Sequence, residues 1–161
     1  MRHLLIKYIS REDNHVDPNF TWLTYGDSGN KGVQIKNTLT PGSYVFFHTS
    51  YANSAYITAY FYVEKILTKG DNRQEIECLK ADSRFDEVVI IGSRTHSKIL
   101  TFPISFDKKV VDKLRSLNIN WNWVESNQQT ELKTISDSTR SHREISDEEV
   151  EWLLSQCKCR G

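Results

Sequence analysis

The stretch that decides the fold is Tyr56-Ile57-Thr58-Ala59-Tyr60-Phe61-Tyr62-Val63, in which aliphatic or phenylalanine residues alternate with tyrosines and a threonine. A period of two places successive side chains on opposite faces, so this pattern predicts a β-strand. The run Tyr44-Val45-Phe46-Phe47-His48 follows the turn Leu39-Thr40-Pro41-Gly42-Ser43 and is typical of a buried strand. The centre of the chain is therefore expected to be β-structure.

Further apolar runs extend this pattern outward in both directions. With the two central runs they predict about five or six strands, the others being residues 3–9, 75–80, 87–92 and 99–106. Apolar spacing predicts a helix over residues 107–117, and a capping-box pair, Ser146 and Glu149, predicts a second helix at the C-terminus. Residues 10–37 and 126–142 are polar and turn-rich, so both are expected to be long loops.

Length, charge and the distribution of apolar residues limit the classes of protein to which the chain can belong. The 161 residues suit one domain, residues 1–161, which we expect to stand alone or to be a module of a larger protein. Lys plus Arg number 21 and Asp plus Glu number 21, so any nucleic-acid contact requires a local basic patch. No apolar run approaches the length of a membrane span and the first residues lack a signal-peptide pattern, so a cytoplasmic location is expected.

A search for catalytic motifs finds none. The nucleophile elbow, the P-loop, the dinucleotide-binding glycines and the deaminase zinc pattern are all missing, and the five histidines are scattered. Asp107-Lys108-Lys109 has the letters of a nuclease motif, but it stands at the start of a predicted helix. The sequence thus predicts no catalytic residues, no metal and no cofactor, and a non-enzymatic role.

Aromatic and basic residues suggest a binding surface instead. There are 4 Trp, 7 Tyr and 7 Phe, and several stand in polar surroundings, where they would suit stacking on a nucleobase: Trp22, Tyr25, Tyr51, Trp121 and Trp123. If extended, Trp121-Asn122-Trp123 would present both indoles on one side. Cations concentrated after residue 92 and around residue 140 predict phosphate contacts by Arg94, Lys98, Lys109, Arg140 and Arg143.

Three segments in this order resemble PUA-like domains, the group that includes the EVE, ASCH and YTH families. They are Trp22-Leu23-Thr24-Tyr25-Gly26-Asp27, the Pro41-Gly42 turn with its strand, and residues 56–66. Ser43 and Ala59 replace an acid and a glycine that are usual in the family. The resemblance covers about residues 20 to 155 and implies an α+β fold, a compact β-barrel flanked by helices. It also implies a pocket for a modified base flipped out of DNA or RNA.

By position, Tyr25 and Asp27 match the Tyr-Gly-Asp motif of these domains, and Ser93 and Ser97 match a later loop. We therefore expect a reader of modified nucleic acid, in which Asp27 or Ser28 hydrogen-bonds the base edge. Such readers serve modification-dependent restriction systems, so a nuclease or motor subunit is an expected partner. Two alternatives stay open, namely a metal-dependent nuclease or nucleotide hydrolase, and a protein-interaction module that docks its aromatic loops on a partner.

Overall fold

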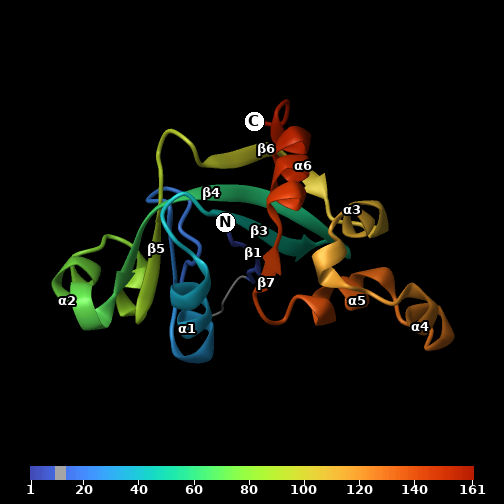
Figure 1. The fold of residues 1–161 in the computed structure, drawn as a ribbon, viewed down its shortest axis with the longest axis horizontal. Helices are drawn as coiled ribbons and strands as arrows, with labels where there is room; N and C mark the ends of the chain where they lie inside the picture. The colour runs from blue at the N-terminus through green and yellow to red at the C-terminus, as the bar shows by residue number, and fades with distance from the viewer. Residues whose placement is uncertain (10–13) are drawn as a thin grey trace.

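The structure, a computed structural model, describes residues 1–9 and 14–161 (Figure 1). Within these residues a seven-stranded mixed sheet has the order β2-β5-β4-β3-β1-β7, and β6 pairs with β4 outside this path. The strands are β1 (His3–Lys7), β2 (Thr24–Asp27), β3 (Tyr44–Tyr51), β4 (Ser54–Thr68), β5 (Val88–Gly92), β6 (Lys98–Ser105) and β7 (Arg143–Ile145). β1 and β3 are parallel, whereas the other ladders are antiparallel.

The long strand β4 contains the alternating run of residues 56–63. Its first part pairs with β3 and β6, and its last part pairs with β5. The register shifts between Ile57 and Ala59 and again between Val63 and Lys65. Such irregularities bend a strand and change which face a side chain occupies. Ile57 accordingly packs into one core cluster, and Ala59 and Phe61 pack into another.

The two core clusters lie on opposite faces of the central strands. On β1, Leu5 packs in one cluster while Leu4 and Ile6 pack in the other, as the period of two requires. The first cluster is covered by the helices of the C-terminal half. The second is enclosed by the bent sheet and by α1, whose Ile35 is fully buried in it.

Eight helical segments accompany the sheet in the described part of the chain. They are α1 (Gly29–Thr38), α2 (Lys69–Glu77), η1 (Asp82–Phe85), α3 (Lys108–Lys113), η2 (Arg115–Leu117), α4 (Trp121–Ser126), α5 (Glu131–Ser138) and α6 (Asp147–Cys157). The predicted capping box of α6 is present: Ser146 accepts from the Glu149 backbone, and the Glu149 side chain accepts in return. No described helix has both the length and the apolar character needed to cross a membrane.

The α+β class is confirmed, but four details of the prediction differ from the structure. The described sheet has seven strands rather than five or six, and its path ends at β2 and β7, which do not pair, so it is not closed into a barrel. Residues 75–80, predicted as a strand, are the end of α2 up to residue 77 and irregular structure after it. The two predicted loops contain regular elements, namely β2 and α1 in the first and α5 in the second.

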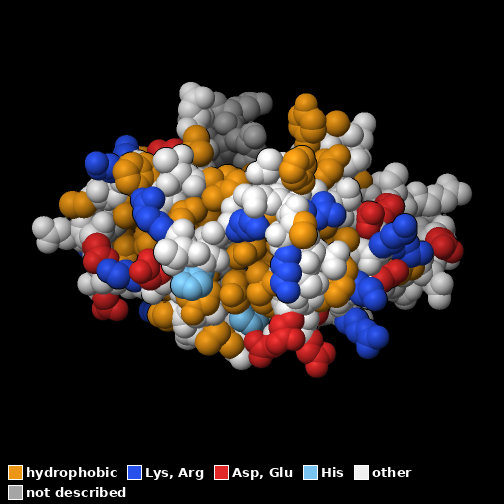
Figure 2. Space-filling view, turned by 90° about the horizontal axis from the view of Figure 1, so that it is seen from above, with side chains coloured by type: hydrophobic (Ala, Val, Ile, Leu, Met, Phe, Trp, Pro, Cys, Tyr) orange, Lys and Arg blue, Asp and Glu red, His pale blue; other side chains and the backbone are white. Residues whose placement is uncertain are grey.

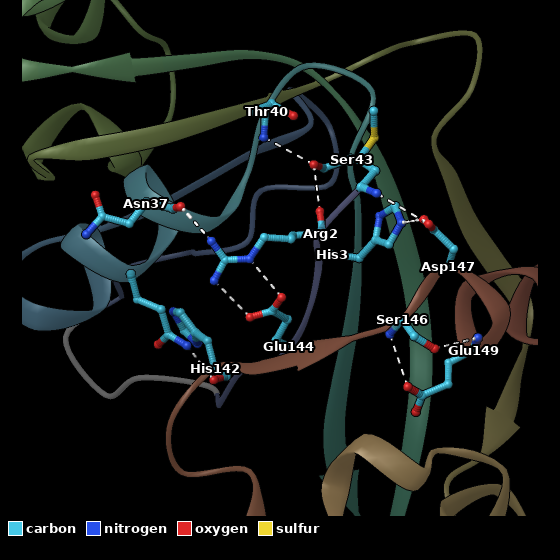
Figure 3. A network of polar contacts seen from close by, with 12 residues as sticks. Arg2, His3, Asn37, Thr40, Ser43, His142, Glu144, Ser146, Asp147 and Glu149 are labelled. Carbon is cyan, nitrogen blue, oxygen red and sulfur yellow. Dashed lines mark hydrogen bonds and ion pairs between the residues drawn. The ribbon is translucent and has the colours of Figure 1, made fainter.

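Polar contacts tie the N-terminal strand to the C-terminal part of the chain (Figure 3). The Arg2 guanidinium makes a two-point contact with Glu144, at 2.8 and 3.0 Å, and also donates to the Asn37 carbonyl at the end of α1. His3 Nε2 lies 2.7 Å from Asp147 Oδ1. These contacts fix β1 and β7 beside the end of α1.

Candidate functional site

A small cavity lies where the end of β1 meets β2. Its volume is about 280 Å³, and the side chains that line it mix aromatic, acidic and basic groups: Lys7, Tyr8, Ile9, His15, Asp17, Tyr25, Gly26, Asp27, Lys31 and Asp86. The strands supply the walls, and Lys31 comes from the first turn of α1. A concave site with a few converging polar groups is the usual form of a ligand site.

Asp27 is held in this cavity by two short hydrogen bonds to one oxygen. The Tyr25 hydroxyl donates to Asp27 Oδ2 at 2.6 Å, and His142 Nε2 lies 2.6 Å from the same atom. His142 is almost fully buried, and Gln34 of α1 donates to its backbone carbonyl at 2.7 Å. Neither contact uses Oδ1, and the Asp27 side chain is 20% exposed, so Asp27 can still accept a hydrogen bond from a ligand.

Tyr25 is fixed by burial as well as by this bond. Burial and the nearby Asp27 carboxylate raise the pKa of Tyr25 well above its ordinary value. The phenol therefore stays protonated at neutral pH and acts as a donor. Its ring also packs against Phe47 and His142, with centroids 5.4 and 5.9 Å away. The Tyr25–Asp27–His142 group is thus rigid.

Two further carboxyl groups, Asp17 and Asp86, meet beside this group. Asp17 Oδ2 accepts from the Gly26 backbone N–H at 3.0 Å, and Asp86 Oδ1 accepts from the Ser28 hydroxyl at 3.4 Å. The other oxygens, Asp17 Oδ1 and Asp86 Oδ2, are buried and have no donor among the described residues. Burial, together with the charges of Asp86 and Asp27, raises the pKa of Asp17 to about 8. Burial raises the pKa of Asp86 as well.

Gly26 makes this close approach of acids possible. A Cβ atom on Gly26 would lie 2.6 Å from Asp86 Oδ2 and 2.8 Å from Asp86 Cβ, which is closer than such atoms can come. The glycine of the Tyr-Gly-Asp motif therefore has a steric role, because it lets Asp86 lie directly against the backbone of β2.

Tyr8 supplies the aromatic wall at the end of β1. Its ring meets Phe20 and Phe47 edge-on, with centroids 5.8 and 6.4 Å away, and its hydroxyl lies 2.7 Å from Thr58 Oγ1. The residue is half-buried, so part of its surface faces the cavity. Such a ring is held in place and can still contact a planar ligand.

The structure brings together only some of the predicted pocket residues. Tyr25 and Asp27 line the cavity, and Ser28 follows Asp27 in the chain and donates to Asp86. Trp22 is 40% exposed and lies beside Arg94, whose guanidinium carbon is 5.8 Å from the indole centroid. This pair is at the other end of β2, which alone spans about 10 Å. Ser93 and Ser97 are in the turn after β5, where the Ser97 hydroxyl accepts from the Tyr62 backbone N–H at 3.0 Å.

Trp121 and Trp123 lie well away from the cavity. They are in α4, so the expected extended conformation is wrong, and helical geometry turns them by about 200° from each other. Trp121 packs on the first core cluster and donates to Asp112, whereas Tyr25 packs in the second cluster. Figure 1 places α4 at the opposite end of the molecule from β5. Tyr51 is 77% exposed at the β3–β4 turn.

The predicted phosphate ligands are dispersed over several elements. Arg143 donates to the carbonyls of Ser138, Ser116 and Leu117, so its guanidinium holds the chain together. Arg140 pairs with Asp137, and Lys98 donates to the Cys157 carbonyl. Lys109 is exposed on α3. On the face shown in Figure 2, basic side chains are interspersed with apolar ones and do not form a single patch.

Sequence reasoning missed eight residues of this site, namely Lys7, Tyr8, Ile9, His15, Asp17, Lys31, Asp86 and His142. His142 is 115 residues from its partner Asp27, so no local spacing connects them. His15 and Asp17 are two residues apart, and an acid beside a histidine was the available signal. The ligand atoms of His15, Asp17 and Asp86 lie within 4.8 Å of one another, which makes them the one described group of three that could hold a metal ion.

Comparison with known proteins identifies the fold. No protein-family model and no curated protein matches the chain. Among solved structures it is similar to human THYN1 in complex with 5-methylcytosine-containing DNA, at 15% identity and a TM-score of 0.50, over 100% of both chains. It also matches the DUF55 domain of human thymocyte nuclear protein 1, at 18% identity and a TM-score of 0.45, over 98% of this chain and 99% of that one. The resemblance seen in the sequence is thereby confirmed at the level of fold: the chain has a PUA-like fold.

Proposed function

We propose that the chain reads modified bases in DNA and that the base enters the cavity between β1 and β2. The observation that carries this proposal is the position of Asp27, a partly exposed carboxylate held by Tyr25 and His142 beside the aromatic wall of Tyr8. A reader needs a rigid hydrogen-bonding group for the base edge and an apolar surface for the ring. The cavity offers both.

Asp27 favours a base that donates hydrogen bonds. Cytosine N4 and adenine N6 are amines, at positions where thymine O4 and guanine O6 are carbonyl oxygens. An amine can donate to Asp27 Oδ1, and a carbonyl oxygen would be repelled by it. A methyl group on the base would meet Tyr8 and the exposed side chain of Ile9. The proposed ligand is therefore a methylated cytosine or adenine.

Lys7 and Lys31 would hold the phosphates beside the flipped nucleotide. Both line the cavity, and Lys31 is exposed in the first turn of α1. Lysines at the rim supply the salt-dependent part of the binding free energy, while the cavity discriminates between modified and unmodified bases. Arg94, beside Trp22, would contact the strand farther along.

The comparison with THYN1 supports this proposal, since a structure of the same fold is in complex with 5-methylcytosine-containing DNA. Because the identity to THYN1 is only 15%, the similarity supports the fold alone. The proposed ligand rests on the residues that line the cavity. We extend the proposal to the setting predicted from the sequence: a cytoplasmic reader module that directs a nuclease or motor subunit to modified DNA.

The proposal is tested by fluorescence anisotropy with matched oligonucleotides. The set contains unmodified, 5-methylcytosine, 5-hydroxymethylcytosine and N6-methyladenine forms, each single- and double-stranded, with RNA counterparts, at two salt concentrations. We expect a preference of about tenfold or more for one modified DNA, equal to about 1.4 kcal/mol. Uniform, salt-sensitive binding to all of them would contradict the proposal.

A further inference from the structure

A second feature of this region points to a bound cation. His15 and Asp17 come from the segment before β2, and Asp86 comes from the residue after η1. Their ligand atoms all lie within 4.8 Å of one another, and His15 Nε2 is 3.9 Å from Asp17 Oδ2. The group contains one imidazole and two carboxylates.

Two oxygens of this group are buried without a donor. The Asp17 side chain is only 7% exposed, and neither Asp17 Oδ1 nor Asp86 Oδ2 has a hydrogen-bond partner among the described residues. A buried carboxylate oxygen without a donor is costly, and two carboxylates beside each other also repel. A positive species between them, either a proton or a metal ion, removes both costs.

We propose that His15, Asp17 and Asp86 bind a divalent transition-metal ion such as Zn²⁺ or Mn²⁺. An imidazole nitrogen with two carboxylate oxygens is a donor set that these ions accept, whereas Mg²⁺ and Ca²⁺ prefer oxygen alone. Ligand atoms around one tetrahedral ion lie about 3.4 Å apart, so the observed separations need only small side-chain rotations.

The segments that carry these ligands are already held in place. The Val16 backbone N–H donates to Asp82 Oδ2 at 2.7 Å, which ties the His15–Asp17 segment to η1, just before Asp86. Gly26 and Ser28 donate to Asp17 and Asp86 through the bonds described above. Outer contacts of this kind orient metal ligands and raise affinity.

Such an ion would lie beside the proposed base site but is independent of it. It would offset the negative charge that Asp17 and Asp86 add next to Asp27, and it would fix one wall of the cavity. Because the ion needs no nucleic acid, its binding can be measured on the protein alone. Failure of the metal proposal would therefore leave the reader proposal standing, and the reverse also holds.

Titration calorimetry and thermal unfolding of the full chain, with Mn²⁺ as the first probe, test the proposal. Mn²⁺ is chosen because thiolates favour softer ions, and the chain has exposed thiols at Cys78 and Cys159. Zn²⁺ is then measured in a variant with both of these cysteines changed to serine. We expect one ion per chain and a rise in Tm that follows ion concentration.

Two isosteric variants and a control complete the experiment. Asp17→Asn and Asp86→Asn should each weaken ion binding by more than about tenfold, because losing even an outer contact of a metal site typically costs about 10- to 100-fold. Glu151→Gln removes an exposed carboxylate from α6 and should bind the ion as the parent does. No binding, or equal affinity in Asp17→Asn and the parent, would overturn the proposal.

Discussion

Replacing Asp17 with asparagine should stabilise the protein in metal-free buffer. Asparagine has nearly the same shape: its oxygen can accept from the Gly26 N–H, and its amide can donate toward Asp86. The variant removes an acid that the fold disfavours in its charged form. Asp17 Oδ1, which is buried without a donor in the parent, is replaced by the amide NH₂ of asparagine, which is itself a donor.

The size of the effect follows from the raised pKa of Asp17, which is about 8 against an ordinary value of 3.8. Between these values the folded state keeps a proton that the unfolded state loses, so the folded state is increasingly disfavoured as pH rises. The stability that protonated Asp17 gives the folded state is fully present below about pH 4. As the pH rises from there it falls by up to about 1.4 kcal/mol per pH unit, and it levels off above about pH 8. At pH 7 the titration of Asp17 therefore lowers the free energy of unfolding by about 4 kcal/mol relative to its value below pH 4.

Urea unfolding of parent and variant from pH 4 to 8, with a chelator present, measures this difference. Asp17→Asn should gain about 2 to 4 kcal/mol at pH 7 and little at pH 4, since the parent carboxyl is protonated there. Asp147→Asn is a control for which the change in stability should have the opposite sign. Hydrogen bonds from His3 and the N-terminal amine lower the pKa of Asp147, so this variant should lose stability at pH 7. A variant less stable than the parent at pH 7, or an equal difference at every pH, would refute the reasoning.

Three other predictions follow from the same geometry. Gly26→Ala should cost about 1 to 3 kcal/mol in urea unfolding, because its Cβ would overlap Asp86; an unchanged midpoint would contradict the close approach. Arg143→Ala should cost about 1.5 to 3 kcal/mol by losing charged hydrogen bonds to three carbonyls, and it should leave base preference unchanged. Lys31→Ala should weaken binding to every oligonucleotide alike and lower the salt slope by about 1, whereas an unchanged slope would argue against a phosphate contact.

The central strands could be predicted from the sequence because their signal is local. The alternation in residues 56–63 and the apolar run at residues 44–48 identify β4 and β3. The bulges could not be predicted, because they depend on how β4 pairs with three different strands. Helix α1 was missed for a related reason: its sequence contains two glycines, and it is supported by burial of Ile35 against the sheet.

The candidate site also has a part that a local motif predicts and a part that only the fold brings together. Asp27 and Tyr25 were found because they are close together in a short motif, and the structure places the Tyr25 hydroxyl on Asp27. His142 and Asp86 reach the cavity only through the fold, so a single sequence carries no spacing that connects them to Asp27. The tryptophans were chosen for their chemistry alone, and folding places Trp22 and Trp121 in different parts of the molecule.

The most direct test of the account compares Asp27→Asn with Trp121→Ala in binding to methylated and unmethylated oligonucleotides. Asp27 lies in the cavity, whereas Trp121 lies on the first core cluster, and circular dichroism checks that both variants are folded. The account predicts that Asp27→Asn loses the preference for the modified base and that Trp121→Ala retains it. A preference that survives Asp27→Asn and disappears in Trp121→Ala would contradict the account and move the base site to α4.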